Sequence, residues 1–391
     1  MRGWWKRLDW LALAVTIVLI AIGTVAIRSA GYARVETVFH GMWISNLMTA
    51  GFGLVLYFLI ALTDYRKALG FVALPAYVVS LLLLVAVLIF GAEQFGGRRW
   101  LWFFQPSEVA KLCVIALTAV LFGAARSRVA GVRTTFCGFL LAGALVGVPA
   151  LLILAEPDLG TALTLVPSVL VMFLAAGVWR KGLVTIVLVG GLAALAVLGA
   201  VYEAERPGVP AARREKILRY VPLKAHQLKR VRVFLFPEED RLGAGYNLRQ
   251  AKISIGSGGF SGKGIGKGES NHLKYLPQAI SMNDFIFCVW AEETGYVGSA
   301  VLLALFGLLL LRGCRTAFRA TDGEGRLLAL GVTALIFAHV YVNIAMSVGI
   351  VPITGLPLPF ISSGRTFLIV VLCGLGLIQS VNIHREEKKH D

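Results

Sequence analysis

Ten apolar runs, each near the length that a helix needs to cross a lipid bilayer, constrain what this chain can fold into. A hydrocarbon core of roughly 30 Å takes about 20 apolar residues in a helix, because lipid offers the backbone no hydrogen-bond partners. Hydrophobic residues make up 57% of the 391 residues and charged residues only 15%, far from the balance of a soluble domain. We therefore predict an all-α polytopic membrane protein with ten transmembrane helices, built as one membrane domain over residues 1–391. The runs are 10–27, 41–63, 70–92, 107–124, 134–155, 159–179, 182–202, 285–311, 327–350 and 366–382.

The first run is interpreted as a true span rather than as a signal peptide. The segment RSAGYARVE that follows it is an ambiguous cleavage site, and many further spans follow. The five cysteines show no ligand spacing, and most of them lie inside apolar runs. We interpret them as small core residues, neither a disulfide framework nor a metal site.

Basic residues in the short connections predict the orientation of the chain, because cytoplasmic connections of membrane proteins are rich in Lys and Arg. With the N-terminus inside, every even-numbered connection is basic, so ten spans with both termini cytoplasmic are self-consistent. The net charge of +16 is therefore interpreted as an orientation signal, and no nucleic-acid partner is expected. The basic inside segments contain Arg2 to Arg7, Arg66 and Lys67, Arg126 to Arg133, Arg180 and Lys181, and Arg312 to Arg319.

This orientation places the longest hydrophilic stretch, residues 203–284, outside the cell as one large extracytoplasmic loop. Its first half, 213–232, carries eight basic residues and one acidic residue, interleaved with apolar ones. The pattern fits an amphipathic helix on anionic lipid headgroups or a solvated basic loop. The second half is rich in Gly and contains Lys263 and Lys267, a composition typical of backbone that approaches a phosphate. The Walker and dinucleotide patterns both fail, and a flexible loop is the alternative.

Charged residues inside the apolar runs point to function, because burying them in a membrane costs free energy. Glu108 and Lys111 lie three residues apart, which sets them on one helix face and allows a salt bridge. Asp158 opens the sixth run. The alternative is structural, with Lys111 paired to Glu108 or Asp158 to hold helices together. Further polar residues of the later runs are Glu292, Glu293, His339 and Arg365.

Asp284 ends the large loop at the start of the eighth run, beside apolar Phe285, Ile286 and Phe287. A carboxylate at a boundary between water and lipid tends to have a raised pKa, which suits a general base. A helix N-terminus would oppose that shift. From these residues alone, Asp284 is a candidate base or a simple helix cap.

Several strings along most of the chain together resemble the shape, elongation, division and sporulation family, the SEDS proteins, with RodA-type members favoured over FtsW-type ones. They are GRRW, QPSEVAKL (105–112), EPDLGTAL (156–163), RLGAGY (241–246), the segment from IGSGG to KGIGKG, YLPQA (275–279), NDFIF (283–287), AEETGYVG (291–298) and the segment 343–364. The resemblance implies ten helices in the bacterial plasma membrane. It also implies an enzyme that polymerises lipid II, an undecaprenyl-diphosphate-linked disaccharide-pentapeptide, into peptidoglycan strands. A class B penicillin-binding protein is the implied partner, beside lipid II and membrane lipids.

Carried over by motif, Asp284 matches the essential acid of the family, and Lys111, Glu108 and Asp158 match the supporting charges beneath it. The chain departs from the family pattern in three segments. Met282-Asn283-Asp284 stands where the family usually has His-Thr-Asp, and Leu276-Pro277-Gln278 stands for Leu-Pro-Glu. Residues 362–367 read SSGRTF where the family usually reads SYGGSS, which brings Arg365 towards the expected site.

The predicted reaction is an inverting glycosyl transfer that releases undecaprenyl diphosphate, with Asp284 as general base. Cations that meet the leaving diphosphate and other groups that contact the substrate are expected among Arg98, Lys263, Lys267, Gln278, Glu292, Glu293 and Arg365. No ligand cluster predicts a metal, and we expect no cofactor beyond, at most, a divalent cation. The two rival hypotheses are a lipid II transporter and a non-catalytic scaffold that activates a penicillin-binding partner.

Overall fold

The computed structural model of the chain describes residues 4–32, 41–94, 97–101, 104–123, 131–156, 158–206, 208–240, 242–269 and 281–385. All ten predicted runs are helices in it, and the all-α prediction is confirmed. Of the described helices, nine are long and apolar enough to cross a membrane, and Gly160–Ala176 within α8 is a shorter apolar one. The ten are α2 (Trp10–Tyr32), α4 (Met42–Leu62), α5 (Tyr65–Phe90), α6 (Pro106–Gly123), α7 (Phe136–Ala155), α8 (Leu159–Ala176), α9 (Arg180–Glu205), α15 (Ile286–Arg319), α16 (Gly323–Val348) and α17 (Arg365–His384).

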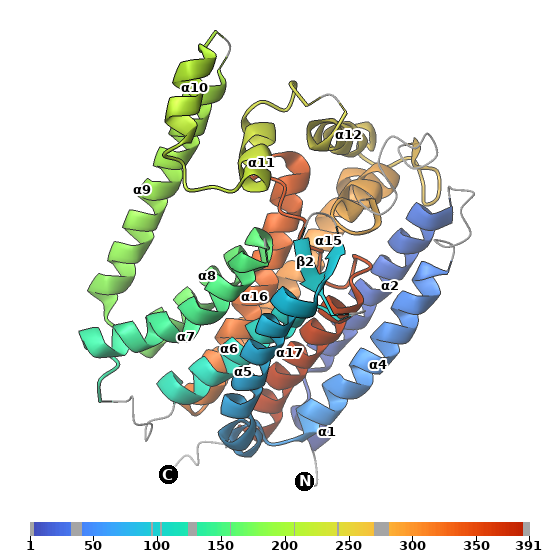
Figure 1. Ribbon diagram of the computed structural model, residues 1–391. Helices are drawn as coiled ribbons and strands as arrows, with labels where there is room; N and C mark the ends of the chain where they lie inside the picture. The colour runs from blue at the N-terminus through green and yellow to red at the C-terminus, as the bar shows by residue number, and fades with distance from the viewer. Residues whose placement is uncertain are drawn as a thin grey trace.

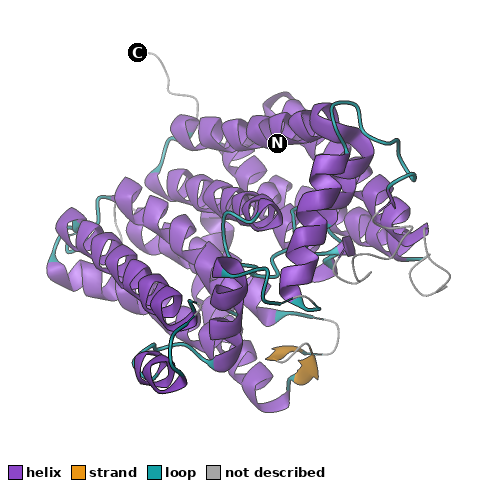
Figure 2. Cartoon of the chain, turned by 90° about the horizontal axis from the view of Figure 1, so that it is seen from above, coloured by secondary structure: helices purple, strands orange, loops and turns teal. Residues whose placement is uncertain are grey.

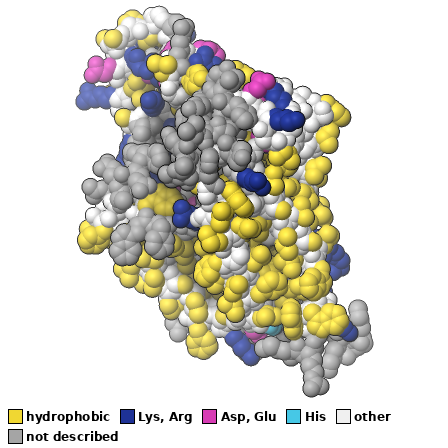
Figure 3. Space-filling model, turned by 90° about the vertical axis from the view of Figure 1, so that its right-hand side faces the viewer, with side chains coloured by type: hydrophobic (Ala, Val, Ile, Leu, Met, Phe, Trp, Pro, Cys, Tyr) yellow, Lys and Arg dark blue, Asp and Glu magenta, His cyan; other side chains and the backbone are white. Residues whose placement is uncertain are grey.

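The helices form one bundle in which the depth of burial differs greatly from helix to helix (Figure 1). In the most apolar 18-residue stretch of α6 and of α17, 78% is buried inside the protein. In the corresponding stretch of α9 only 6% is buried. Helix α9 stands at the edge of the bundle, so lipid must cover its apolar surface. A broad band of hydrophobic side chains covers the face shown in Figure 3. The polar residues of α6 and α16 are therefore held inside the bundle, away from lipid.

Both described ends of the chain lie at the same end of the bundle, where the short helix α1 (Trp4–Arg7) contacts the end of α17. This agrees with an even number of crossings (Figure 1). Which end faces the cytoplasm stays a prediction from the charge pattern.

A short β-hairpin that the sequence did not predict follows α5. Strands β1 (Ala92–Gln94) and β2 (Gly97–Trp100) pair in antiparallel fashion, and Figure 2 shows them at the edge of the helical body. The segment 92–100 carries a weak strand signal because it is short and contains Gly. The hairpin matters because it positions Arg99.

The described part of the large loop, which leaves out 207, 241 and 270–280, contains three helices rather than one amphipathic helix. They are α10 (Ala211–Leu218), α11 (Ala225–Leu235) and α12 (Ala244–Ser257). Part of the basic charge of the first half is paired with glutamates at the end of α9 and in the loop. Arg213 bonds Glu203 at 3.1 Å, Arg214 bonds Glu205 at 2.8 Å, and Arg232 bonds Glu239 at 2.9 Å. The first two pairs dock α10 on α9, and Arg232, which also lies 3.3 Å from Glu205, docks α11 there.

The Gly-rich half of the loop packs against a break in α15. Gly295 has non-helical backbone angles inside α15, and this break frees the Tyr296 amide to donate to the Gly259 carbonyl at 2.9 Å. From the loop side, the Gly264 amide donates to the Glu293 carbonyl at 2.9 Å. The glycines therefore permit a close backbone contact between the loop and α15.

Replacing Gly262 by alanine tests this contact. Gly262 has φ +79°, and a Cβ there would meet the Glu293 carbonyl oxygen at 2.2 Å. We expect Gly262→Ala to lower the free energy of unfolding by about 3 kcal/mol, from backbone strain plus the clash. Gly259→Ala is the matched control: it has φ +57° but no atom within 4 Å, so only about 1 kcal/mol of strain is expected. Equal melting temperatures of the two variants in detergent would contradict this interpretation.

Candidate active site

Asp284 lies in the turn before α15 and is held by its main chain. The Asn343 side chain donates one hydrogen bond to the Asp284 carbonyl at 3.0 Å and another to the Leu356 carbonyl at 2.7 Å. The N-cap of α15 is Phe285, and no side chain caps this end. The helix-cap alternative for Asp284 is therefore wrong, and its carboxyl is free to act on a substrate.

The environment of the Asp284 carboxyl combines burial with two arginines. Burial raises its pKa to about 6, while the positive charges of Arg230 and Arg99 oppose the rise. The residue keeps part of its surface accessible, as a group that meets a substrate must. Oδ2 faces the segment beyond α16, since a Cβ on Gly355 would lie 3.5 Å from it. A pKa of about 6 leaves Asp284 mostly ionised at neutral pH and still basic enough to take up a proton.

The two arginines reach Asp284 from separate elements. Arg230 belongs to α11 and donates to the Thr354 carbonyl at 3.0 Å, which fixes the loop over the site. Arg99 belongs to β2. Burial, and after it the charge of Arg99, lowers the pKa of Arg230. Arginine is suited to phosphate because its planar fork of donors matches the oxygens. The arrangement places two cations beside one candidate base.

Asp158 and Glu156 lie next to this pair of arginines. Asp158 is the N-cap of α8 and accepts hydrogen bonds from the Thr161 amide at 3.1 Å, the Thr161 hydroxyl at 2.8 Å and the Gln105 amide at 3.0 Å. Both oxygens of its carboxylate therefore accept hydrogen bonds, which hold the side chain in place. Both oxygens of Glu156 are buried with no hydrogen-bond partner among the described residues. Burial and the charge of Asp158 raise the pKa of Glu156 to about 8, although Arg99 opposes this shift.

A buried ionic layer lies beneath this cluster, inside the bundle. Lys111 Nζ lies 3.0 Å from Glu108 Oε2 and 2.8 Å from His339 Nε2, and it faces the ring of Phe367 at 5.6 Å. The predicted salt bridge between Glu108 and Lys111 is confirmed. His339 and Asn343 are four residues apart on α16, so one helix face contacts both the ionic layer and the Asp284 backbone.

The remaining predicted residues lie in other surroundings. Glu292 binds Lys263 at 2.8 Å and the Glu269 amide at 2.9 Å, and Glu293 accepts a hydrogen bond from Ser29 of α2. These contacts anchor the Gly-rich loop to the bundle. Lys267 is exposed in that loop, and Arg365 is exposed at the start of α17. The side chain of Arg98 and the whole of Gln278 lie outside the described residues.

Two of the segments that depart from the family pattern contact each other. Ser362 donates to the Asn283 carbonyl at 2.6 Å, and Ser363 donates to the Asn283 side chain. The Ser363 amide also donates to the Met282 carbonyl at 3.2 Å. Both segments flank Asp284, so together they shape one wall of the site. Arg365, the unusual cation of the second segment, follows directly on this wall.

Sequence reasoning missed Arg99, Arg230 and Glu156 as site residues. Neighbouring residues of a strand point to opposite faces. Because the hairpin was not predicted, the sequence did not show which of Arg98 and Arg99 points towards the site. Arg230 was hidden in a run of eight basic residues. Glu156 stands two residues before Asp158, and its position at the C-terminal end of α7 became visible only in the structure.

Comparisons with known proteins cover nearly the whole chain. A family model described as cell cycle protein, of the FtsW, RodA and SpoVE type, matches residues 9–389. Peptidoglycan glycosyltransferase MrdB of Escherichia coli strain K12 is 36% identical, over 98% of this chain and 96% of that relative. Stage V sporulation protein E of Bacillus subtilis strain 168 is 32% identical over 96% of each chain.

Solved structures agree with the sequence matches. A chain of "Structural coordination of polymerization and crosslinking by a peptidoglycan synthase complex" superposes with a TM-score of 0.72 and 31% identity, covering 96% of this chain and 97% of that one. The rod shape determining protein RodA of Thermus thermophilus superposes with a TM-score of 0.67 and 28% identity, over 97% and 98% of the two chains. With this fold and a family match over 9–389, the chain belongs to the FtsW, RodA and SpoVE family of multi-pass bacterial inner-membrane proteins.

Proposed function

We propose that this protein is a peptidoglycan glycosyltransferase that polymerises lipid II on the outer face of the plasma membrane, with Asp284 as general base. Its support is similarity over nearly the full length to peptidoglycan glycosyltransferases. The structural observation that carries the role of Asp284 is the partly buried carboxyl with a pKa of about 6 beside Arg230 and Arg99. The proposal assigns a supporting role to three further charges. They are Asp158 beside the arginines and the buried pair of Glu108 and Lys111.

The reaction requires one base and a site for negative charge. Asp284 takes the proton from the acceptor sugar hydroxyl while that oxygen attacks the anomeric carbon of the donor. The new glycosidic C–O bond forms as the bond to the lipid diphosphate breaks, and the electron pair leaves with the diphosphate. Arg99 and Arg230 stabilise the charge that develops there. One carboxylate suffices because the transfer inverts the anomeric centre. The proposal also includes a divalent cation bound to the diphosphate. It further includes substrate contacts from one or more of Arg98, Lys263, Lys267, Gln278, Glu292, Glu293 and Arg365.

A class B penicillin-binding protein is the proposed partner. One structural neighbour is a chain of a peptidoglycan synthase complex. On the loop side of α15, the stacked rings of Phe260 and Tyr296 lie 6.0 Å apart and are 73% and 67% exposed. An exposed aromatic pair on the polymerising face is suited to contact such a partner.

Purified protein supplied with lipid II tests the enzyme against its rivals. Glycan polymer made without a partner would support the transferase, and polymer made only with the penicillin-binding partner would support a transferase that needs activation. In sealed vesicles, lipid II crossing the membrane without polymer would favour the transporter. If the partner made equal amounts of polymer with wild type and with an Asp284→Asn variant, this chain would be a scaffold.

The pH dependence of polymerisation follows from the raised pKa of Asp284. The base must be ionised, so the rate should be near its plateau at pH 7.5 and fall about tenfold per pH unit below pH 6. The effect of pH on the free energy of unfolding has the opposite sign to its effect on the rate. Because the folded pKa lies above the ordinary value of 3.8, the contribution of Asp284 to stability is complete below pH 3.8 and lost as the pH rises through 6. A rate that stays constant from pH 5 to 8 would rule out Asp284 as the base.

A further inference from the structure

Six basic side chains converge on one cavity at the end of the bundle where α1 and the end of α17 meet. The cavity has a volume of about 160 Å³. Its cations come from three segments far apart in the sequence: α1 with Lys6 at its end, the last two turns of α15, and the residue after α17. Asp9 also lines it and is already paired with Arg312 at 2.7 Å. The six basic residues are Lys6, Arg7, Arg312, Arg315, Arg319 and Arg385.

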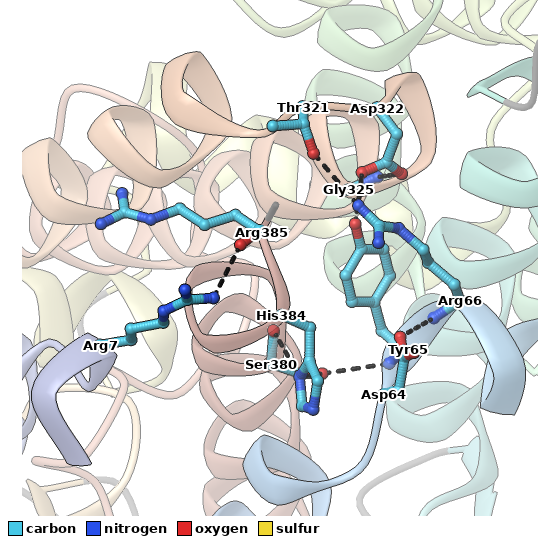
Figure 4. A network of polar contacts seen from close by, with 10 residues as sticks. All are labelled: Arg7, Asp64, Tyr65, Arg66, Thr321, Asp322, Gly325, Ser380, His384 and Arg385. Atoms are coloured by element: carbon cyan, nitrogen blue, oxygen red, sulfur yellow. Dashed lines mark hydrogen bonds and ion pairs between the residues drawn. The ribbon is translucent and has the colours of Figure 1, made fainter. Parts of the chain in front are cut away.

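Some of these cations bond other parts of the fold, whereas others are exposed on the surface. Arg7 donates a hydrogen bond to the Arg385 carbonyl at 3.1 Å and so supplies a partner to a backbone carbonyl at the end of α17 (Figure 4). Arg315 and Arg319 are exposed and one turn apart on α15. Within the described part of the chain, no acidic side chain forms an ion pair with either of them. Bringing like charges around one cavity costs free energy unless an anion offsets it.

The tryptophans beside the cavity indicate its depth in the membrane. Trp5 and Trp10 are 53% and 56% exposed, although their side chains are large and apolar. The Trp10 ring donates to the Trp5 carbonyl at 3.0 Å, and Lys6 lies over the Trp5 ring at 5.4 Å. Exposed tryptophans of membrane proteins gather at the level of the lipid headgroups. The cavity therefore lies where lipid phosphates are concentrated, which favours a lipid over a soluble anion.

We propose that this cavity binds the phosphate of an anionic phospholipid headgroup. Arginines offer phosphate several charge-assisted hydrogen bonds in a matching geometry. The orientation rule explains why basic residues lie on this side of the membrane. It does not explain why cations from α1, from α15 and from the residue after α17 surround one cavity. The site is separate from Asp284, and its test does not depend on the proposed enzymatic activity.

Binding of short-chain lipids to the purified full-length protein tests this site. The probes are dioctanoyl phosphatidylglycerol, dioctanoyl phosphatidylcholine and inorganic phosphate at matched ionic strength, and the readout is the rise in melting temperature with ligand concentration. We expect phosphatidylglycerol to raise the melting temperature most. The double variant Arg315→Gln/Arg319→Gln should bind it about 25-fold more weakly, at about fivefold per cation removed.

The matched control is Arg180→Gln/Lys181→Gln, which removes two exposed cations at the same end of the bundle but outside the cavity. It should bind phosphatidylglycerol as wild type does. Equal binding by the two double variants would overturn the site, and so would equal effects of phosphatidylglycerol and phosphatidylcholine. An effect of inorganic phosphate as large as that of phosphatidylglycerol would overturn the lipid assignment in favour of a soluble anion.

Discussion

Asp284→Asn is expected to reduce lipid II polymerisation by about 10²- to 10⁴-fold, the contribution of a positioned general base. The substitution keeps the size of the side chain and removes its capacity to accept the proton. Because Asn343 holds residue 284 through its main-chain carbonyl, the position of the turn should not change. The measurement is the initial rate of polymer formation from lipid II at pH 7.5.

A second carboxylate of the large loop supplies the control. Glu215 is exposed on α10, and Glu215→Gln should polymerise lipid II at the wild-type rate. Melting temperatures show whether all three proteins are folded. A folded Asp284→Asn variant with wild-type activity would sink the role assigned to Asp284, while leaving membership of the family intact.

Lys111→Met is expected to lower the free energy of unfolding by about 3–5 kcal/mol, because it leaves Glu108 as a buried charge without its cation. Lys111 is fully buried, and Glu108 is 3% exposed at its side chain. The fall should appear as a lower melting temperature in detergent, together with loss of polymerisation. Water cannot offset the lost ion pair at this depth.

The double variant Glu108→Gln/Lys111→Met separates charge from packing. It removes both charges, so most of the stability should return. Lys181→Met, on exposed α9, should leave the melting temperature unchanged. If the double variant were as unstable as Lys111→Met, packing around Lys111 rather than its charge would be the cause.

The helices were predictable because lipid permits few alternatives for an apolar chain. The salt bridge between Glu108 and Lys111 followed from spacing on a single helix. The polar network at the foot of the bundle, where Tyr65 and Arg66 meet Asp322 (Figure 4), joins elements more than 250 residues apart. Local patterns carry no information about such contacts.

The candidate site was predictable only in part for the same reason. Asp284 stood out by its place at the end of the loop. Arg99 and Arg230 reach it from a hairpin and a loop helix, and Glu156 lies beside Arg99 from the end of α7. Only the tertiary fold brings these elements together. The Lys263 ammonium, chosen as a phosphate ligand, is paired with Glu292 and Glu269. Composition could not reveal that those acids lie within reach.

The hydrogen bond from the Ser363 hydroxyl to the Asn283 side chain couples these two positions in evolution. A change at either residue alters the partner of the other, so their effects on fitness are coupled. Ser362 stays outside this pair because it donates to the main-chain carbonyl of residue 283. Restoring the family residue at 283 alone would place a threonine where the Ser363 hydroxyl now meets an asparagine side chain. Homologues that carry one departure should therefore tend to carry the other, and evolution is expected to have crossed between the two states by paired steps.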